Sequence, residues 1–123
     1  MLRVRQIVLD AADIDRVAEF WSGLLGWQIA DRSADWISLR GDQIGLAVQR
    51  APEQRRPDWP DGAIPQQLHL DIPVADIDLA ERLVLELGGS KLAERPSEQP
   101  PFRIYADPAG HPFCLEYDGS TAA

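Results

Sequence analysis

The sequence predicts an α+β fold built from two copies of a βαβββ module, because several of its features occur twice. The tetrapeptide ADID occupies positions 12–15 and again positions 75–78, a shift of 63 positions. The same shift pairs Gly26 with Gly89. Copies of about sixty residues are longer than typical solenoid repeats, which also need several copies to be stable. The pattern therefore indicates one duplicated module and a functional surface shared by the two copies.

The first copy, 1–50, is predicted to contain one helix and four strands. Alternating β-forming residues over 3–9 predict the first strand. Asp13 is suited to be the N-cap of a helix over 14–25, whose apolar side chains fall on one stripe. Gly26 follows at the C-cap position. Three short strands are expected near 27–31, 35–40 and 43–49.

The second copy, 66–118, repeats this order. A strand is predicted at 66–72, and Asp76 is expected to cap a helix over 77–87. Further strands are expected near 90–93, 102–106 and 112–117. The prolines and charges of 51–65 predict a linker between the copies. Each half is marginal as an independent core, so 1–123 is expected to form one domain, with the two sheets curling into a half-open barrel.

Composition excludes several classes of protein. The formal net charge of −8 argues against a nucleic-acid-binding protein. No apolar run is long enough to span a membrane, and no signal peptide is recognisable at the start. The single cysteine, Cys114, excludes an internal disulfide and suits a reducing environment, so a cytoplasmic location is expected.

Alternation along the strands divides each predicted sheet into an apolar face and a polar face. The polar face is too poor in large apolar residues to form a core, so it is predicted to hold a metal or a small ligand. Trp36 and Ser38 are placed there because Ile37 and Leu39 point to the other side. A shift of 67 aligns Ile37 with Ile104 and places Arg103 and Tyr105 there as well. The predicted polar face collects Gln6, Trp36, Ser38, Gln49, His69, Asp71, Arg103, Tyr105, Cys114 and Glu116.

The paired modules, their ADID helix starts, the LGW at 25–27 and the ending DPAGHPFCLE together resemble the vicinal oxygen chelate superfamily. That superfamily includes glyoxalase I, extradiol dioxygenases and bleomycin-resistance proteins. The resemblance covers nearly the whole chain and is nearest to the small glyoxalase-like proteins of bacteria. It implies the glyoxalase/bleomycin-resistance/dioxygenase fold, with a ligand cavity between the paired modules.

The resemblance also implies a metal site. Metal-binding members take one ligand from the first and last strand of each module, which corresponds here to Gln6, Gln49, His69 and Glu116. Such a site would hold a divalent ion such as zinc or nickel, with no organic cofactor. Gln49 departs from the carboxylate expected in glyoxalase I and leaves Glu116 as the one strand-end carboxylate for proton transfer. The first copy has no histidine, which disfavours the two-histidine iron site of an extradiol dioxygenase.

Two functions follow from the resemblance. In the first, the protein is a metal-dependent lyase or isomerase in which the metal chelates vicinal substrate oxygens and Glu116 is catalytic. In the second, it is a metal-free protein that sequesters a metabolite or an antibiotic, as bleomycin-resistance proteins do. In either, the predicted substrate-binding residues are Trp36, Ser38, Asp71, Arg103, Tyr105 and Cys114.

Two further expectations concern the linker and the assembly. Trp59 in the linker is expected either to cover the ligand site as a lid or to fasten the linker to the sheet. A linker of about fifteen residues is long enough for the modules to pair within one chain or to exchange between two chains. A twofold homodimer is predicted, with no nucleic-acid or membrane partner.

Overall fold

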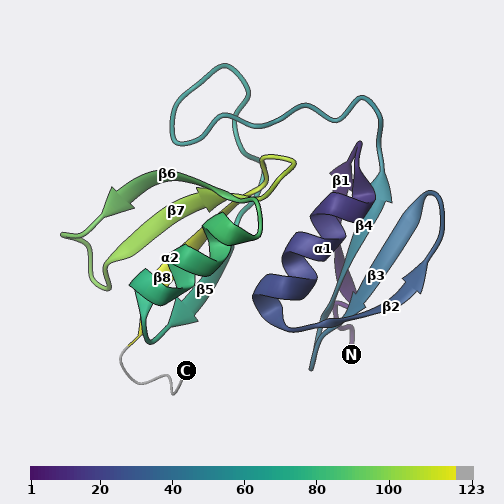
Figure 1. Ribbon diagram of the computed structural model, residues 1–123, viewed down its shortest axis with the longest axis horizontal. Helices are drawn as coiled ribbons and strands as arrows, with labels where there is room; N and C mark the ends of the chain where they lie inside the picture. The colour runs from purple at the N-terminus through teal and green to yellow at the C-terminus, as the bar shows by residue number, and fades with distance from the viewer. Residues whose placement is uncertain (119–123) are drawn as a thin grey trace. The chain divides into compact units, whose positions relative to one another are not determined.

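The computed structural model describes residues 1–118 and divides into two compact units, Met1–Arg55 and a second that begins at Arg56 (Figure 1). Both units have the predicted βαβββ order. The first contains β1 (Gln6–Ala11), α1 (Ile14–Leu25), β2 (Gln28–Arg32), β3 (Trp36–Arg40) and β4 (Gly45–Arg50). The second contains β5 (Leu70–Val74), α2 (Ile77–Glu86), β6 (Ser90–Arg95), β7 (Phe102–Ala106) and β8 (Pro112–Tyr117). Within 1–118, neither helix has the length and apolar character needed to cross a membrane.

The two sheets have the same topology. Their strand orders are β1-β4-β3-β2 and β5-β8-β7-β6, with one parallel pair, β1–β4 or β5–β8, and two antiparallel pairs in each. Neither sheet closes on itself, since each ends in two edge strands. The predicted α+β class and tandem modules are confirmed. The first strand of the second copy begins at Leu70, four residues later than the predicted start at position 66.

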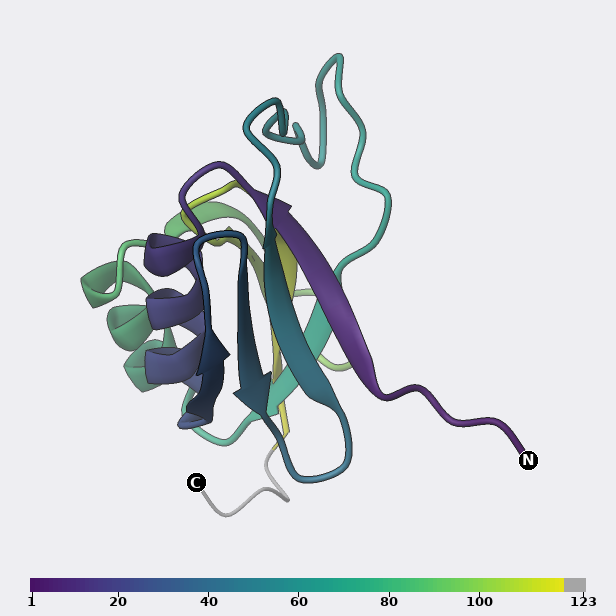
Figure 2. The same cartoon turned by 90° about the vertical axis from the view of Figure 1, so that its right-hand side faces the viewer.

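In the first unit, α1 covers one face of the sheet (Figure 2). Asp13 caps the helix by accepting a hydrogen bond from the amide of Arg16 at 3.1 Å. Gly26 ends it in the left-handed conformation, with φ of 71°, which glycine adopts without strain. The buried side of α1 packs on the apolar face of the sheet, which we call the helix face. Its core includes Val17, Phe20, Trp21, Ile37, Leu39, Leu46 and Val48.

The opposite side of the first sheet, which we call its far face, carries Gln6, Trp36, Ser38, Ala47 and Gln49. The ladders establish this register, because Trp36 pairs with Gln49 and Ser38 with Ala47 across β3 and β4. Residues directly opposite each other in an antiparallel pair lie on the same side of the sheet. The sequence-based face assignment for this unit is therefore confirmed.

In the second unit the assignment for β7 is wrong. Arg103 pairs with Leu115 and Tyr105 with Phe113, so both lie on the helix face together with core residues. Tyr105 is completely buried and stacks on Phe113, with ring centroids 5.6 Å apart. The far face of this sheet instead carries Asp71, Phe102, Ile104, Cys114 and Glu116.

The cause of this error is a displacement of one residue. Gln49 and Glu116 are 67 positions apart, but their cross-strand partners Trp36 and Phe102 are 66 apart. Applying one shift to both strands therefore placed β7 one residue out of register. Since side chains alternate between faces, a slip of one position moves a whole strand to the other side of the sheet.

Arg103 and Tyr105 belong to an ion-pair network between β7, β6 and α2. Arg103 lies 2.8 Å from a carboxylate oxygen of Asp78 and 3.3 Å from one of Glu81. The Tyr105 hydroxyl donates to the carboxylate of Glu81 at 2.8 Å. Lys91 lies 2.9 Å from the same carboxylate. These contacts explain how a helix with only one fully buried side chain, Val84, is held to its sheet.

Candidate functional site

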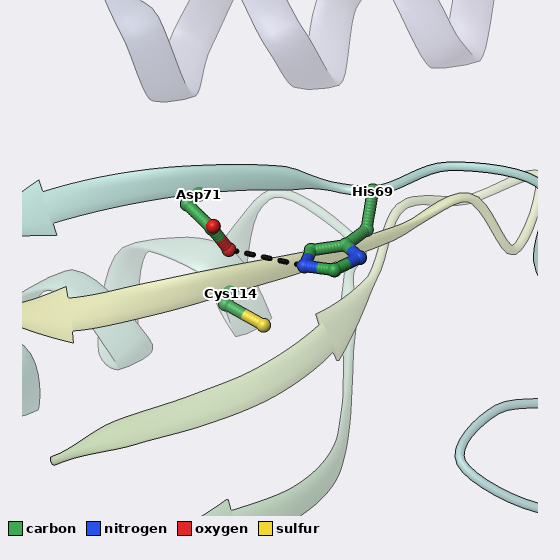
Figure 3. A group of neighbouring side chains, drawn as sticks. All are labelled: His69, Asp71 and Cys114. Atoms are coloured by element: carbon green, nitrogen blue, oxygen red, sulfur yellow. Dashed lines mark ion pairs between the residues drawn. The ribbon is translucent and has the colours of Figure 1, made fainter.

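Three potential metal-binding side chains meet on the far face of the second sheet. His69 precedes β5, Asp71 lies within it, and Cys114 lies opposite Asp71 on β8. One ligand atom from each lies within 4.8 Å of the other two (Figure 3). His69 Nε2 is 3.2 Å from Asp71 Oδ1. The parallel pairing of β5 with β8 explains this meeting, because alternate residues of adjacent strands share one side of the sheet.

The thiol of Cys114 is the buried member of this group, with 3 % of its surface exposed. Burial raises its pKa to about 12, and a hydrogen bond to Asp71 and the charges of Asp71 and Glu116 act in the same direction. Cys114 is therefore a protonated thiol at neutral pH unless a cation replaces the proton. This state does not suit a nucleophile, which would need a depressed pKa.

His69 is fixed in place by three contacts. Its Nδ1 lies 3.1 Å from the side-chain oxygen of Gln66, and its Nε2 faces Asp71. The indole of Trp59 stacks on the imidazole, with ring centroids 4.9 Å apart and planes 24° apart. Imidazoles that bind metal commonly have the second nitrogen held by an outer partner, which is the position of Gln66 here.

The group has the donor chemistry of a site for a thiophilic divalent metal. Imidazole nitrogen, carboxylate oxygen and thiolate sulfur are all zinc ligands, and three protein ligands leave a fourth position for water or substrate. Donor atoms around tetrahedral zinc lie roughly 3.3–3.6 Å from one another, as metal–ligand bonds of about 2.0–2.3 Å require. The His69–Asp71 separation of 3.2 Å is close to this range. The residues therefore fit a metal ion.

Of the four predicted metal ligands, the structure brings only His69 into this group. Glu116 is not a member of it, because it lies one strand repeat beyond Cys114 on the same side of β8. It lines a separate hollow of about 550 Å³ together with Pro73, Gln99, Pro100, Pro101, Tyr117 and Asp118. Asp71 and Cys114, predicted from the sequence as substrate-binding residues, are the residues that accompany His69.

The first unit has a cavity of its own on the far face. It has a volume of about 480 Å³, and Gln6, Trp36 and Ser38 are among its lining residues. The Ser38 hydroxyl donates to Asp31 at 3.4 Å. Gln49 does not line this cavity, although it pairs with Trp36 across the ladder. Three of the predicted residues are thus brought together, while Gln49 is exposed at the end of β4.

Two side-chain contacts of the second unit were not predicted from the sequence. Gln66 contacts His69 across three positions of irregular chain, and Arg56 donates to the carbonyl of Pro108 at 2.9 Å. Neither contact follows a helix or strand period, so no pattern in the sequence could have indicated it. Arg103 and Tyr105, by contrast, were assigned to the polar face because of the register error in β7.

Comparison with known proteins agrees with this architecture. A family model described as a glyoxalase-like domain matches residues 6–116. A comparison with curated protein sequences gave no match.

Several solved structures share the fold. A glyoxalase-related enzyme from Fulvimarina pelagi is 20% identical, with a TM-score of 0.73, and the alignment covers 96% of this chain and 89% of that one. A glyoxalase/bleomycin resistance protein/dioxygenase family enzyme from Burkholderia phytofirmans is 13% identical, with a TM-score of 0.73 and coverage of 91% and 95%. The fosfomycin resistance protein FosX from Listeria monocytogenes is 12% identical, with a TM-score of 0.75 and coverage of 96% and 94%. At such identities the similarity establishes the fold alone.

Proposed function

Because the chain belongs to the glyoxalase-like domain family, we propose that it binds a small molecule with the help of a divalent metal held by His69, Asp71 and Cys114. The observation that carries this proposal is the convergence of three different donor atoms on one side of a sheet. The sulfur donor favours zinc or another thiophilic ion over magnesium or calcium. A bound metal would supply Lewis-acid polarisation of oxygen atoms on the ligand.

Other residues of the chain are proposed to contact the ligand and to transfer a proton. Trp36 and Ser38, with Gln6, offer an aromatic surface and hydrogen-bonding groups in the cavity of the first unit. Asp71 would be occupied as a ligand in the metal-bound group, so Glu116 remains the proposed residue for proton transfer. Arg103 and Tyr105 take no part in this proposal, because they are engaged with α2.

A metal measurement tests the proposal directly. Protein purified without a chelator or a nickel column is expected to contain zinc, and His69→Ala is expected to lose it. His111→Ala is the matched control, since His111 is the only other histidine and lies in the turn before β8. Cys114→Ser keeps the size of the side chain but removes the thiolate, so it should weaken zinc binding at least tenfold. Equal zinc content in the His69→Ala and wild-type proteins would show that the site is wrongly assigned.

A metal-free binding protein is the second candidate function. It is favoured by the first unit, whose far face offers amides and an aromatic ring but no histidine and no carboxylate at the Gln49 position. Glu116→Gln separates the two candidates, with an α-ketoaldehyde–thiol adduct as the probe. The variant should lose turnover if the protein is an enzyme, and it should leave the affinity nearly unchanged if the protein only binds.

We also propose that the protein assembles as a twofold homodimer. The duplicated modules can pair within a chain or between chains, and either arrangement would use one copy of each module. Sedimentation equilibrium at micromolar concentration should give twice the chain mass. A monomer under those conditions would contradict the proposal.

A further inference from the structure

The segment 56–64, which precedes β5, is fixed to the second unit at its first residue. Arg56 donates a hydrogen bond from Nη1 to the carbonyl of Pro108, in the turn before β8. The same turn is shaped around this arginine, because a Cβ on Gly110 would come within 2.2 Å of Arg56 Cγ. Buried Asp107 holds the turn by accepting from the amides of Ala109 and His111, each at 2.9 Å. The segment therefore begins at a well-defined anchor.

The rest of the segment forms a closed loop. The amide of Asp58 donates to the carbonyl of Ile64 at 2.6 Å, and the amide of Ile64 donates back to the Asp58 carboxylate at 3.3 Å. Gly62 closes this loop with a φ of +145°, where a Cβ would lie 2.1 Å from that of Asp58. Trp59 directly follows Asp58 and is thus presented from a loop that is pinned at both ends.

Trp59 covers one face of the His69 imidazole. The two rings stack at 4.9 Å with 24° between their planes. The two ring nitrogens are directed in different ways, with Nδ1 toward Gln66 and Nε2 toward Asp71. An imidazole with one face covered and one edge held can no longer turn freely about its side-chain torsions, so Nε2 is kept on the side of Asp71 and Cys114.

We infer that Trp59 is a positioning residue, which holds His69 in the orientation that presents Nε2 to Asp71 and Cys114. The inference rests on the proposed function for its metal-binding consequence, but the stacking itself can be tested without metal. It assigns part of the segment between the two repeats to the site, and it distinguishes between the two predicted roles of Trp59. Trp59 fastens the segment to the sheet through the very side chain that would bind the metal.

The size of the effect follows from the energetics of aromatic pairs. Offset-stacked pairs contribute an amount that corresponds to about 2- to 10-fold in an equilibrium constant. Trp59→Leu should therefore weaken zinc binding about 2- to 10-fold, much less than His69→Ala. Trp59→Phe retains an aromatic face and should restore the affinity to within about twofold of wild type. Asp61→Ala is the matched control, since Asp61 is exposed in the same loop.

Proton NMR of the metal-free protein provides the independent readout. The indole ring current should shift the His69 ring protons upfield, and Trp59→Leu should abolish that shift. The His111 signals serve as an internal reference, since the chain has only two histidines. Far-UV circular dichroism identifies any variant that fails to fold, and Trp59→Phe then takes the place of Trp59→Leu, with a smaller residual shift expected.

The outcomes are distinguishable. A shift that disappears in Trp59→Leu, together with weakened zinc binding that Trp59→Phe restores, supports the inference. His69 signals that are the same in wild type and Trp59→Leu overturn it, whether or not zinc binds. Wild-type protein that shows the shift but binds no zinc would refute the proposed function and leave the positioning of His69 established.

Discussion

Replacing Tyr105 with phenylalanine should destabilise the fold, because the structure places Tyr105 in the core and not on the polar face predicted from the sequence. The Tyr105 ring is completely buried, so phenylalanine fills the same space and leaves no cavity. What is lost is the hydrogen bond from its hydroxyl to Glu81 at 2.8 Å. Burial raises the pKa of the Tyr105 hydroxyl, and its bond to Glu81 adds to this, so the hydroxyl is a donor throughout the neutral range.

The size of the expected loss of stability depends on the ion pairs that Glu81 retains in the Tyr105→Phe variant. A hydrogen bond to a charged group contributes about 1.5–3 kcal/mol to stability. Glu81 still has Lys91 at 2.9 Å and Arg103 at 3.3 Å, and its side chain is 22% exposed, so it is not left as an unpaired buried charge. We therefore expect a loss near the lower end of that range, about 1.5 kcal/mol.

Guanidinium denaturation followed by far-UV circular dichroism measures this loss. The midpoint should fall while the slope stays constant, since the surface exposed on unfolding does not change. Tyr117→Phe is the matched control, because Tyr117 is the only other tyrosine and is 47% exposed. Its effect should lie within about 0.5 kcal/mol of zero. Equal stabilities for the two variants would refute the helix-face register of β7.

Three further predictions concern other parts of the second unit. Burial acts to raise the pKa of Glu81, but hydrogen bonds from Lys91 and Tyr105 and the nearby positive charges lower it overall. The ionised Glu81 therefore stabilises the folded state at pH values above its pKa in the unfolded chain. This stabilisation is lost as the pH falls through the lower pKa of the folded state. Wild type should thus lose stability more steeply than Glu81→Gln between about pH 5 and pH 3, and parallel curves from denaturation at each pH would count against the network. Because the pKa of Cys114 is raised to about 12, its alkylation by iodoacetamide at pH 8, after removal of metal with a chelator, should be slower in the native than in the urea-unfolded protein by on the order of a thousandfold, and comparable rates would show an accessible thiolate. Gly110→Ala should cost about 1–3 kcal/mol in denaturation experiments, because φ is +93° and Arg56 occupies the space; adding Arg56→Ala should recover only the steric part, and an unchanged midpoint for Gly110→Ala would contradict this.

Much of the fold could be predicted from the sequence, because it depends on local signals. The N-caps Asp13 and Asp76 both accept amide hydrogen bonds, from Arg16 and Leu79, as predicted from their place in the repeated tetrapeptide. The helix over 14–25 has the predicted bounds. Such features depend on a few neighbouring residues and on periodicity, which one sequence contains in full.

The site was less accessible to prediction, because it depends on how strands are aligned with one another. Ser38 and Trp36 were placed correctly, since the buried partners Ile37 and Leu39 fix the phase of β3. Arg103 was misplaced, because Ile104 is buried on the far face rather than on the helix face. A single apolar residue between two amphipathic ones cannot by itself define which side of a strand is the core side.

The duplicated architecture explains why this error arose in one copy and not in the other. The connection between β7 and β8 has one residue more than the connection between β3 and β4, so the shift that relates the copies changes from 66 to 67 between these strands. Ala47 and Cys114 occupy corresponding positions in the two copies, but their side chains differ in chemistry. In the first copy that position is a buried alanine, whereas in the second it is the thiol beside Asp71. The two copies keep the same strand order, and among the described residues the three donor side chains of the proposed metal site all lie in the second unit.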